Sequence, residues 1–576
     1  MKKLNFLTSF LIAAVLLSSC GGIDKMKEEY GTLTFNTTPK VLETHGGEVE
    51  YSIQGEIPPE WFNKDAIVEF TPVLTYEGGE EELESKTFQG IDVQANNKVV
   101  EYETGGQIEF NGTFDFEEGM RNSELVMRGE ARVADGEETL PLPERNIAKG
   151  VIATSTMVQV DDAKPVMMED KFQRITSEEK GADIHYVIER DNVRNSELEQ
   201  EDIKKLEDFI KKIQEAKNKN YKGIQIHGYA SPDGPMDLNE RLSQGRKGSA
   251  NEYLNKVIDK KKLSEDEAKK VYKAKTTTED WEGFKKLVEQ SNIEDKDLIL
   301  RVLSMYSDPE VREKEIKNMA ETFKVLAEEV LPKLRRSELM VQIEKVGFSD
   351  AEIKKYIDSK PDTLGLEEVL YAGYELFKDP AQKLEAFEMA AEKEPQCARA
   401  YNNIGYVKIM QGKLDDAKEA LEKANNIVEG KPQILNNLGV VALRNGKVED
   451  AKEYFKKATD AGQNVEYNLG IVNIINGEYD AAINYLQGWE SFNTALAMLL
   501  GEKQGQAQTM LEQIQDKSAH NYYLQAVIAA RNNDKDKVMT SLTTAIDKNA
   551  DLKAKAKTDM EFAEYMSDQE FTSIVE

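Results

Sequence analysis

Residues 401–482 read YNNIGYVKIMQGKLDDAKEALEKANNIVEGKPQILNNLGVVALRNGKVEDAKEYFKKATDAGQNVEYNLGIVNIINGEYDAA. Small residues recur in this stretch at successive intervals of 34 and 31 residues, in three sets: Gly405, Gly439 and Gly470; Gly412, Gly446 and Gly477; and Ala417, Ala451 and Ala482. Small residues at fixed intervals let paired helices approach closely, and a glycine just past a helix ends it. The repetition therefore predicts an array of helix pairs.

The pattern resembles the tetratricopeptide repeat, whose unit is a helix pair of about 34 residues. A degenerate unit precedes the clear ones over residues 366–395, and weaker units follow, one of them over residues 521–551. We therefore expect an all-α solenoid over residues 362–576. The resemblance implies a groove that binds extended peptides or helices.

The family's groove-facing positions can be transferred to this sequence residue by residue. They fall on Asn402, Tyr406, Ile409 and Met410, on Asn436, Val440, Leu443 and Arg444, and on Tyr467, Ile471, Ile474 and Ile475. This set is mostly apolar and lacks a lysine-rich clamp for a C-terminal carboxylate. The expected ligand is a hydrophobic segment of a protein partner. An alternative of equal weight is that another part of this chain, or a stable partner, fills the groove.

A mixed pattern of strands and helices occupies residues 178–346. Apolar residues alternate at Ile184, Tyr186 and Ile188, a helical pattern follows over residues 203–213, and a second strand covers residues 224–229. A second helix covers residues 238–257, and residues 338–343 read as a closing strand. Between them, an insertion at about residues 255–332 is predicted to hold one strand and several helices, with Trp281 as a packing residue.

Residues 228–254, GYASPDGPMDLNERLSQGRKGSANEYL, resemble the OmpA-like peptidoglycan-associated domain. The family places an aromatic turn before a helix that begins with Asn and Leu-Ser-x-x-Arg. The matching residues are Gly228, Tyr229, Gly234, Asn239, Leu242, Ser243 and Arg246. The resemblance implies an α+β domain that binds the free carboxylate of diaminopimelate in peptidoglycan through a turn aspartate and the helix arginine. The insertion resembles a variant found in envelope proteins of Bacteroides and its relatives.

One position departs from the family pattern, because Ser231 stands where the family has the turn aspartate and Asp233 lies two residues further on. A guanidinium grips a carboxylate in a fork, and an acidic side chain holds an ammonium group. The candidate peptidoglycan-binding residues are therefore Arg246, Asp233, Ser231 and Asn239. The alternative is that Arg246 is a solvated helix residue and the domain only a scaffold.

Residues 30–160 alternate apolar and polar side chains in short runs, as in Val49-Glu50-Tyr51-Ser52-Ile53. Turns are predicted at Gly78-Gly79 and at Asn111-Gly112. These runs predict an all-β domain, a sandwich. Trp61 is interpreted as a packing residue.

The N-terminus carries Lys2, Lys3 and a short apolar run over residues 6–17, followed by Leu17-Ser18-Ser19-Cys20. The run is too short to span a bilayer and reads as a signal peptide over residues 1–19. Its end resembles the lipobox of bacterial lipoproteins, which implies lipidation at Cys20 and a tether over residues 20–29. A glycine after the cysteine favours the outer membrane. The periplasmic face is expected, with the cell surface as the alternative because three acids lie in residues 24–29.

Composition narrows the classes of function. The chain has 576 residues, with 106 acids against 75 bases, and loss of residues 1–19 moves the formal charge from −31 to −33. Such a field repels nucleic acid, so no nucleic-acid partner is expected. Cys397 has no cysteine partner and is interpreted as a core residue. The four scattered histidines and the absence of nucleophile and phosphate-loop motifs predict no metal, no cofactor and no catalytic residue.

Together these patterns predict a multidomain, non-enzymatic outer-membrane lipoprotein. Its partners would be peptidoglycan, the membrane through the N-terminal lipid, and a protein in the repeat groove. The alternative is an adaptor lipoprotein, exposed at the surface or held in a complex, whose central domain no longer binds peptidoglycan.

Overall fold

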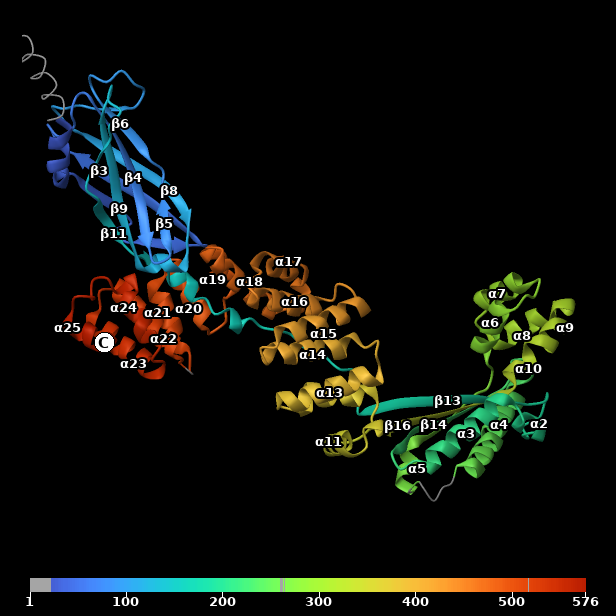
Figure 1. Cartoon of the computed structure of the whole chain (residues 1–576). Coiled ribbons are helices and arrows are strands. Elements are labelled where there is room, and N and C mark those ends of the chain that lie inside the picture. The colour runs from blue at the N-terminus through green and yellow to red at the C-terminus, as the bar shows by residue number, and fades with distance from the viewer. Residues whose placement is uncertain (1–21, 259–262, 264, 516) are drawn as a thin grey trace, which may run out of the picture. The chain divides into compact units, whose positions relative to one another are not determined.

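The computed structural model describes residues 22–258, 263, 265–515 and 517–576, so the predicted signal peptide and Cys20, the expected lipidation site, lie outside the described residues. The chain forms two compact units. One joins the chain up to Glu169 with Phe377–Glu576, and the other is Asp170–Leu376. The β-rich N-terminal region and the helical C-terminal region predicted from the sequence are confirmed (Figure 1). In the part of the chain that the structure describes, no helix has the length and apolarity to cross a membrane.

Two sheets build the N-terminal region. The first contains β1 (Thr34–Thr38), β2 (Leu42–His45), β3 (Glu48–Ile57), β8 (Gly106–Asp115) and β12 (Val151–Ile152). The second contains β4 (Ala66–Tyr76), β5 (Gly79–Glu82), β6 (Lys86–Gly90), β7 (Lys98–Val100), β9 (Ser123–Val133), β10 (Leu140–Pro141) and β11 (Arg145–Lys149). Most neighbours pair antiparallel, whereas β12 with β2 and β6 with β7 run parallel.

Buried side chains from both sheets form one hydrophobic core. The strands contribute to it by alternating buried and exposed side chains, as in β3. Trp61 belongs to this core, and its indole nitrogen donates to the carbonyl of Met26 at 3.0 Å. The turn predicted at Asn111-Gly112 is wrong, since both residues lie inside β8. Gly112 is needed there because a Cβ would come within 2.7 Å of the hydroxyl of Tyr51 on the neighbouring strand.

The second unit contains one sheet and two groups of helices. Its strands are β13 (Ile175–His185), β14 (Lys219–Tyr229), β15 (Tyr272–Thr277) and β16 (Arg336–Val346). Its helices are α2 (Asn195–Leu198), α3 (Glu201–Glu215), α4 (Met236–Val257), α5 (Glu265–Val271), α6 (Trp281–Gln290), α7 (Lys296–Met305), α8 (Pro309–Lys317), α9 (Ala320–Glu329), α10 (Leu331–Leu334), α11 (Asp350–Ser359), α12 (Leu366–Tyr371) and a π-helical turn (Ala372–Leu376).

The strand order is β13-β16-β14-β15, with β15 parallel to β14 and the other pairs antiparallel. Helices α3 and α4 pack on the sheet through one core, and α6 to α10 enclose a second core of their own, against which Trp281 packs. The strand expected around Ile184 to Ile188 differs: β13 begins at Ile175 and ends at His185, and Ile188 is exposed. Its register along β16 explains the extra length, since the pairing extends to Val346.

Helices in succession make up the C-terminal region. They are α13 (Pro380–Lys393), α14 (Ala398–Met410), α15 (Leu414–Ile427), α16 (Pro432–Arg444), α17 (Val448–Lys457), α18 (Gln463–Ile475), α19 (Tyr479–Tyr485), α20 (Phe492–Leu500), α21 (Gln504–Gln513), α22 (Ala519–Arg531), α23 (Lys535–Lys548), α24 (Leu552–Thr558) and α25 (Gln569–Val575). Each helix packs against the next in antiparallel pairs, as Figure 1 shows for α14 to α19. Cys397 is buried just before α14.

Candidate functional site

A stretch of this same chain lies against the helical array. Residues 159–168, called here the groove segment, follow the N-terminal β region and run without sheet pairing past α20, α18, α16 and α14 in that order (Figure 1). The segment therefore runs opposite to the order of the repeats. The structure contains the alternative in which another part of the chain fills the groove.

Four asparagines each hold one residue of the groove segment by both backbone groups. In each case the side-chain oxygen accepts the residue's N–H at 2.7–2.8 Å and the side-chain nitrogen donates to its carbonyl at 2.8–3.0 Å. The pairs are Asn493 with Gln159, Asn468 with Lys164, Asn437 with Val166, and Asn403 with Met168. An extended residue presents both groups on one edge, so this geometry selects extended backbone rather than a side chain.

Two further asparagines complete the row. Asn402 donates to the carbonyl of Val166 at 3.2 Å, and Asn436 donates to that of Lys164 at 3.0 Å. The amides also bond to one another: Asn437 donates to Asn402 at 3.1 Å, and Asn468 donates to Asn436 at 2.9 Å. Because each amide is fixed by its neighbours, its oxygen and nitrogen face the segment in one orientation.

The repeat pattern explains how the asparagines reach the segment. At Gly405 a Cβ would lie 2.5 Å from Leu421 on the second helix of the pair, so the glycine faces that helix. A residue two positions earlier lies about 200° around the helix, on the opposite side. The same glycine contact recurs at Gly439 with Phe455 and at Gly470 with Leu486. The repeats thus direct Asn403, Asn437 and Asn468 away from the paired helix.

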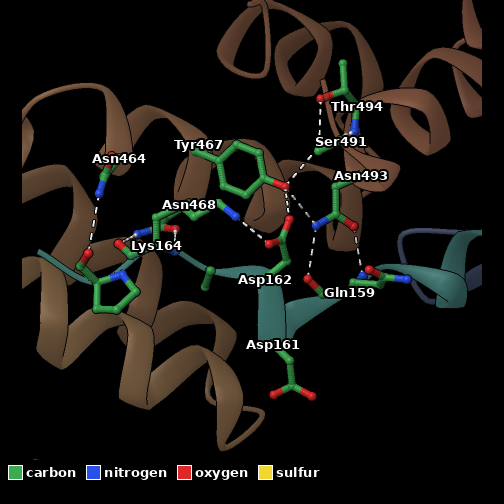
Figure 2. Close-up of polar contacts among 12 residues, drawn as sticks. Gln159, Asp161, Asp162, Lys164, Asn464, Tyr467, Asn468, Ser491, Asn493 and Thr494 are labelled. Carbon is green, nitrogen blue, oxygen red and sulfur yellow. Dashed lines mark hydrogen bonds and ion pairs between the residues drawn. The ribbon is translucent and has the colours of Figure 1, made fainter. Parts of the chain in front are cut away.

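Figure 2 shows the N-terminal half of the groove segment, where Tyr467 of the array lies beside Asp162 and Asn493 beside Gln159. The hydroxyl of Tyr467 donates to the carboxylate of Asp162, which also pairs with the ammonium of Lys164. Burial and the neighbouring Asp162 raise the pKa of Tyr467, so its hydroxyl stays a donor at neutral pH. Arg444 donates to the carbonyls of Asp161 and Ala163, the latter at 3.4 Å, and burial lowers the pKa of its guanidinium.

The predicted groove residues fall into two groups. Asn402, Asn436 and Tyr467 hydrogen-bond the segment, as does Arg444. Ile409, Val440, Leu443, Ile471 and Ile474 are buried, Tyr406 and Ile475 are half-buried, and Met410 is exposed. The bound segment combines apolar residues, Val160, Val166, Met167 and Met168, with the charged Asp161, Asp162 and Lys164. The expected hydrophobic ligand is therefore incomplete rather than wrong, because amide side chains also hold the segment's backbone.

Sequence reasoning missed the asparagines that make the double contacts. Asn403, Asn437 and Asn468 stand two residues before the repeat glycines and keep the same intervals of 34 and 31 residues. That recurrence was a usable signal. Asn493 follows Asn468 by only 25 residues, so this shorter unit escapes a search for a fixed period.

The β region is fastened to the array just before the groove segment begins. Arg531 on α22 pairs with Glu561 and, at 2.5 Å, with Glu43 of β2. Thr154 also donates to Glu561, whose side chain is only 2% exposed. At Gly46, where φ is +63°, a Cβ would lie 2.8 Å from the carbonyl oxygen of Asn476. These contacts fix where the segment enters the array.

In the second unit, the candidate peptidoglycan residues lie close together at the β14–α4 turn. Arg246 is 1% exposed, and its guanidinium donates to the carbonyls of Arg190 at 3.1 Å and Tyr229 at 2.8 Å. It is therefore not the solvated helix residue of the alternative interpretation. Asn239 is also buried and donates to the carbonyl of Gly234 at 2.8 Å.

The acidic residue of this cluster, Asp233, already forms an ion pair with a neighbouring arginine. Asp233 pairs with Arg335 at 3.0 Å, and Ser231 donates to Asp233 while accepting from Arg335 at 3.3 Å. Burial, followed by the nearby Arg335, lowers the pKa of Arg246 to about 10. Among the described residues no carboxylate forms an ion pair with Arg246, whereas Asp233 is already neutralised by Arg335. The arrangement leaves a buried cation with capacity for an anion.

Within the described residues, no three His, Cys, Asp or Glu side chains are placed to hold a metal ion. The row of asparagines along the groove segment offers recognition chemistry for extended backbone, and the buried Arg246 offers it for an anion.

Comparison with known proteins supports the helical region. A tetratricopeptide-repeat family profile matches residues 411–466 and 436–495. No curated protein matches the chain. Among solved structures, a tetratricopeptide repeat protein from Parabacteroides merdae is 14% identical, with a TM-score of 0.29, over 37% of this chain and 91% of that one.

Two further solved structures are similar to part of this chain. PilF of Pseudomonas aeruginosa is 17% identical, with a TM-score of 0.28, over 38% of this chain and 100% of that one. YrrB, described as a repeat protein with an unusual peptide-binding site, is 20% identical, with a TM-score of 0.21, over 36% of this chain and 99% of that one. The C-terminal helical region of this chain contains tetratricopeptide repeats, a module typical of protein–protein interaction.

Proposed function

We propose that this protein is a non-enzymatic scaffold of the bacterial envelope, lipid-anchored at Cys20 to the periplasmic face of the outer membrane. Its repeat array serves as a receptor for extended peptide segments and uses its own groove segment as the resident ligand. The observation that carries the proposal is the row of asparagines that hold Gln159, Lys164, Val166 and Met168 by both backbone groups.

A resident ligand gives the array a structural role. The groove segment connects the N-terminal β region to the second unit, and the β region is itself bonded to α22 through Arg531. The array therefore gathers the β region and the connecting segment into one body. A partner protein with a suitable extended segment would have to displace the resident one, whose effective concentration is high because it is covalently attached.

The receptor function is tested by supplying the segment in trans. The mature chain carrying Cys20→Ser, Val166→Pro and Met168→Pro lacks two N–H donors to Asn437 and Asn403, so its own segment binds weakly. A fluorescein-labelled peptide of residues 157–173 should bind this variant, as measured by anisotropy, and bind the Cys20→Ser chain far less. A folded variant that takes up no peptide would refute the receptor proposal.

The second unit is the part of the chain proposed to bind peptidoglycan. The resemblance to the OmpA-like domain supplies the ligand, the carboxylate of diaminopimelate, and the unpaired guanidinium of Arg246 supports an anion at this place. The ion pair between Asp233 and Arg335 supports the alternative, an adaptor that does not bind peptidoglycan. Asp233 would have to leave Arg335 before it could bind the ammonium group of a ligand.

Sedimentation with purified diaminopimelate-type peptidoglycan separates these two cases. Arg246→Lys keeps the charge and removes the fork, so it should weaken cosedimentation of the mature chain. Arg241→Ala removes an exposed arginine of the same helix and serves as the matched control. Absence of cosedimentation by the parent chain, with the protein folded, would leave the adaptor function and remove the wall contact.

A further inference from the structure

A lysine of the groove segment lies between two aromatic rings of the array. The ammonium of Lys164 is 4.8 Å from the ring centroid of Tyr467 and 5.9 Å from that of Trp489. Its backbone is held by Asn468 and Asn436, so the position of its side chain along the groove is fixed. Ammonium groups at such distances from aromatic faces are attracted by the ring quadrupole.

The two rings are also held by each other and by a neighbouring side chain of the array. Tyr467 is 0% exposed, and its hydroxyl, which donates to Asp162, accepts from the hydroxyl of Ser491 at 3.0 Å (Figure 2). The ring of Trp489 lies 4.8 Å from that of Tyr467 at an interplanar angle of 55°. Two ring faces set at an angle can both attract one compact cation placed between them. An apolar side chain in the same place gains no such electrostatic attraction.

Asp162 makes the arrangement specific for a pair of residues. Its carboxylate accepts from Tyr467 and pairs with Lys164, so the acid and the lysine two positions later are recognised together. The other double contacts, at Gln159, Val166 and Met168, involve backbone groups alone and accept many side chains. Side-chain selectivity is thus concentrated in one place along the groove.

We propose that Tyr467 and Trp489 form a lysine-selective subsite, and that the array takes from partner proteins an extended segment containing Asp-x-Lys. The proposal rests on the receptor function proposed above and adds the chemistry of the partner. A segment without the acid and lysine can still form the asparagine contacts, but it lacks the charge-dependent ones. The resident segment supplies the pattern as Asp162-Ala163-Lys164.

Peptide competition on the Val166→Pro, Met168→Pro chain tests the subsite. The 157–173 peptide with Lys164→Ala should bind about fivefold to thirtyfold more weakly than the parent peptide, the range that corresponds to about 1–2 kcal/mol for a cation held by aromatic rings. The matched control is the same peptide with Lys171→Ala. It removes an equal charge from an exposed residue beyond the groove segment and should bind like the parent.

The tryptophan gives the second arm of the experiment. In a chain that also carries Trp489→Ala, the preference of the parent peptide over the Lys164→Ala peptide should shrink, while both peptides still bind through the asparagines. Equal binding of the two peptides to the chain that retains Trp489 would overturn the subsite and leave the receptor function standing. Failure of every peptide to bind would instead refute the receptor function, so the two failures are distinct.

A measurement on the intact groove guards against misfolding of the proline variant. In the Cys20→Ser chain, Lys164→Ala should speed hydrogen exchange of the Val166 and Met168 amides, whereas Lys171→Ala should not. Unchanged exchange after Lys164→Ala would contradict the subsite without any use of the proline substitutions.

Discussion

Replacing Asn437 by alanine removes the most central contact of the groove segment. The side chain accepts the N–H of Val166 at 2.7 Å, donates to its carbonyl at 2.8 Å and donates to Asn402 at 3.1 Å. The substitution leaves a shorter side chain that offers no hydrogen bond. Alanine also favours helix, so α16 itself should persist.

The expected loss follows from the hydrogen bonds. Each bond contributes about 0.5–1.5 kcal/mol net, so the two contacts with Val166 account for roughly 1–3 kcal/mol of the free energy that opposes opening of the segment. In native-state hydrogen exchange this corresponds to a fall in protection of about fivefold to 150-fold. The loss should be confined to the segment, because α16 keeps its buried apolar residues.

Hydrogen exchange of the amides of Val166 and Met168, followed by mass spectrometry, is the assay. Asn484→Ala, which removes an exposed asparagine of α19, is the matched control and should leave this exchange unchanged. Equal protection in Asn437→Ala and the parent chain, with both folded, would mean that the asparagine row does not hold the segment.

Three further outcomes are expected. Gly46→Ala should lower the melting temperature more than Gly47→Ala, because both place alanine at positive φ but a Cβ collides with the array only at Gly46; equal shifts would contradict this docking. Arg531→Ala should destabilise the chain by about 3–5 kcal/mol in urea unfolding, since it leaves buried Glu561 unpaired, and Arg531→Met with Glu561→Gln should recover most of the loss. Burial, followed by nearby Glu338, raises the pKa of Asp183. The pKa of Asp183 is thus higher in the folded state than in the unfolded state, so ionised Asp183 destabilises the fold. This destabilisation is absent at low pH and develops as pH rises through the folded-state pKa. Asp183→Asn should therefore stabilise the chain at pH 7 and have little effect near pH 3, and a gain of equal size at both values would contradict the assignment.

Periodicity carried the sequence prediction where structure depends on local spacing. Glycines and alanines at fixed intervals identified the repeats, because each fills a tight place against its paired helix, as Gly405 does against Leu421. Alternation identified the strands of the β region. It misplaced a turn at Asn111-Gly112, since a glycine that makes room for Tyr51 looks the same in sequence as a glycine that turns the chain.

The occupant of the groove was beyond local patterns. Residues 159–168 show neither the helical nor the strand period of apolar residues. Their hydrogen-bond partners lie about 240–330 residues away along the chain, as for Met168 with Asn403 and Gln159 with Asn493. The cluster around Arg246 and Asp233 was likewise only partly predictable from local sequence. Arg246 and Asp233 were identified from a motif, whereas Arg335, which pairs with Asp233, lies about 100 residues further along the chain, just before β16, and was not identified.

A double-mutant cycle between Asn437→Ala and Val166→Pro isolates the contact between the array and its resident segment. The free energy of opening is read from exchange of the Met168 amide in the parent, the two single variants and the double variant. We expect a coupling free energy of about 1 kcal/mol or more between the two sites. Additive effects, with a coupling below about 0.3 kcal/mol, would contradict the claim that the array holds its own segment through these asparagines.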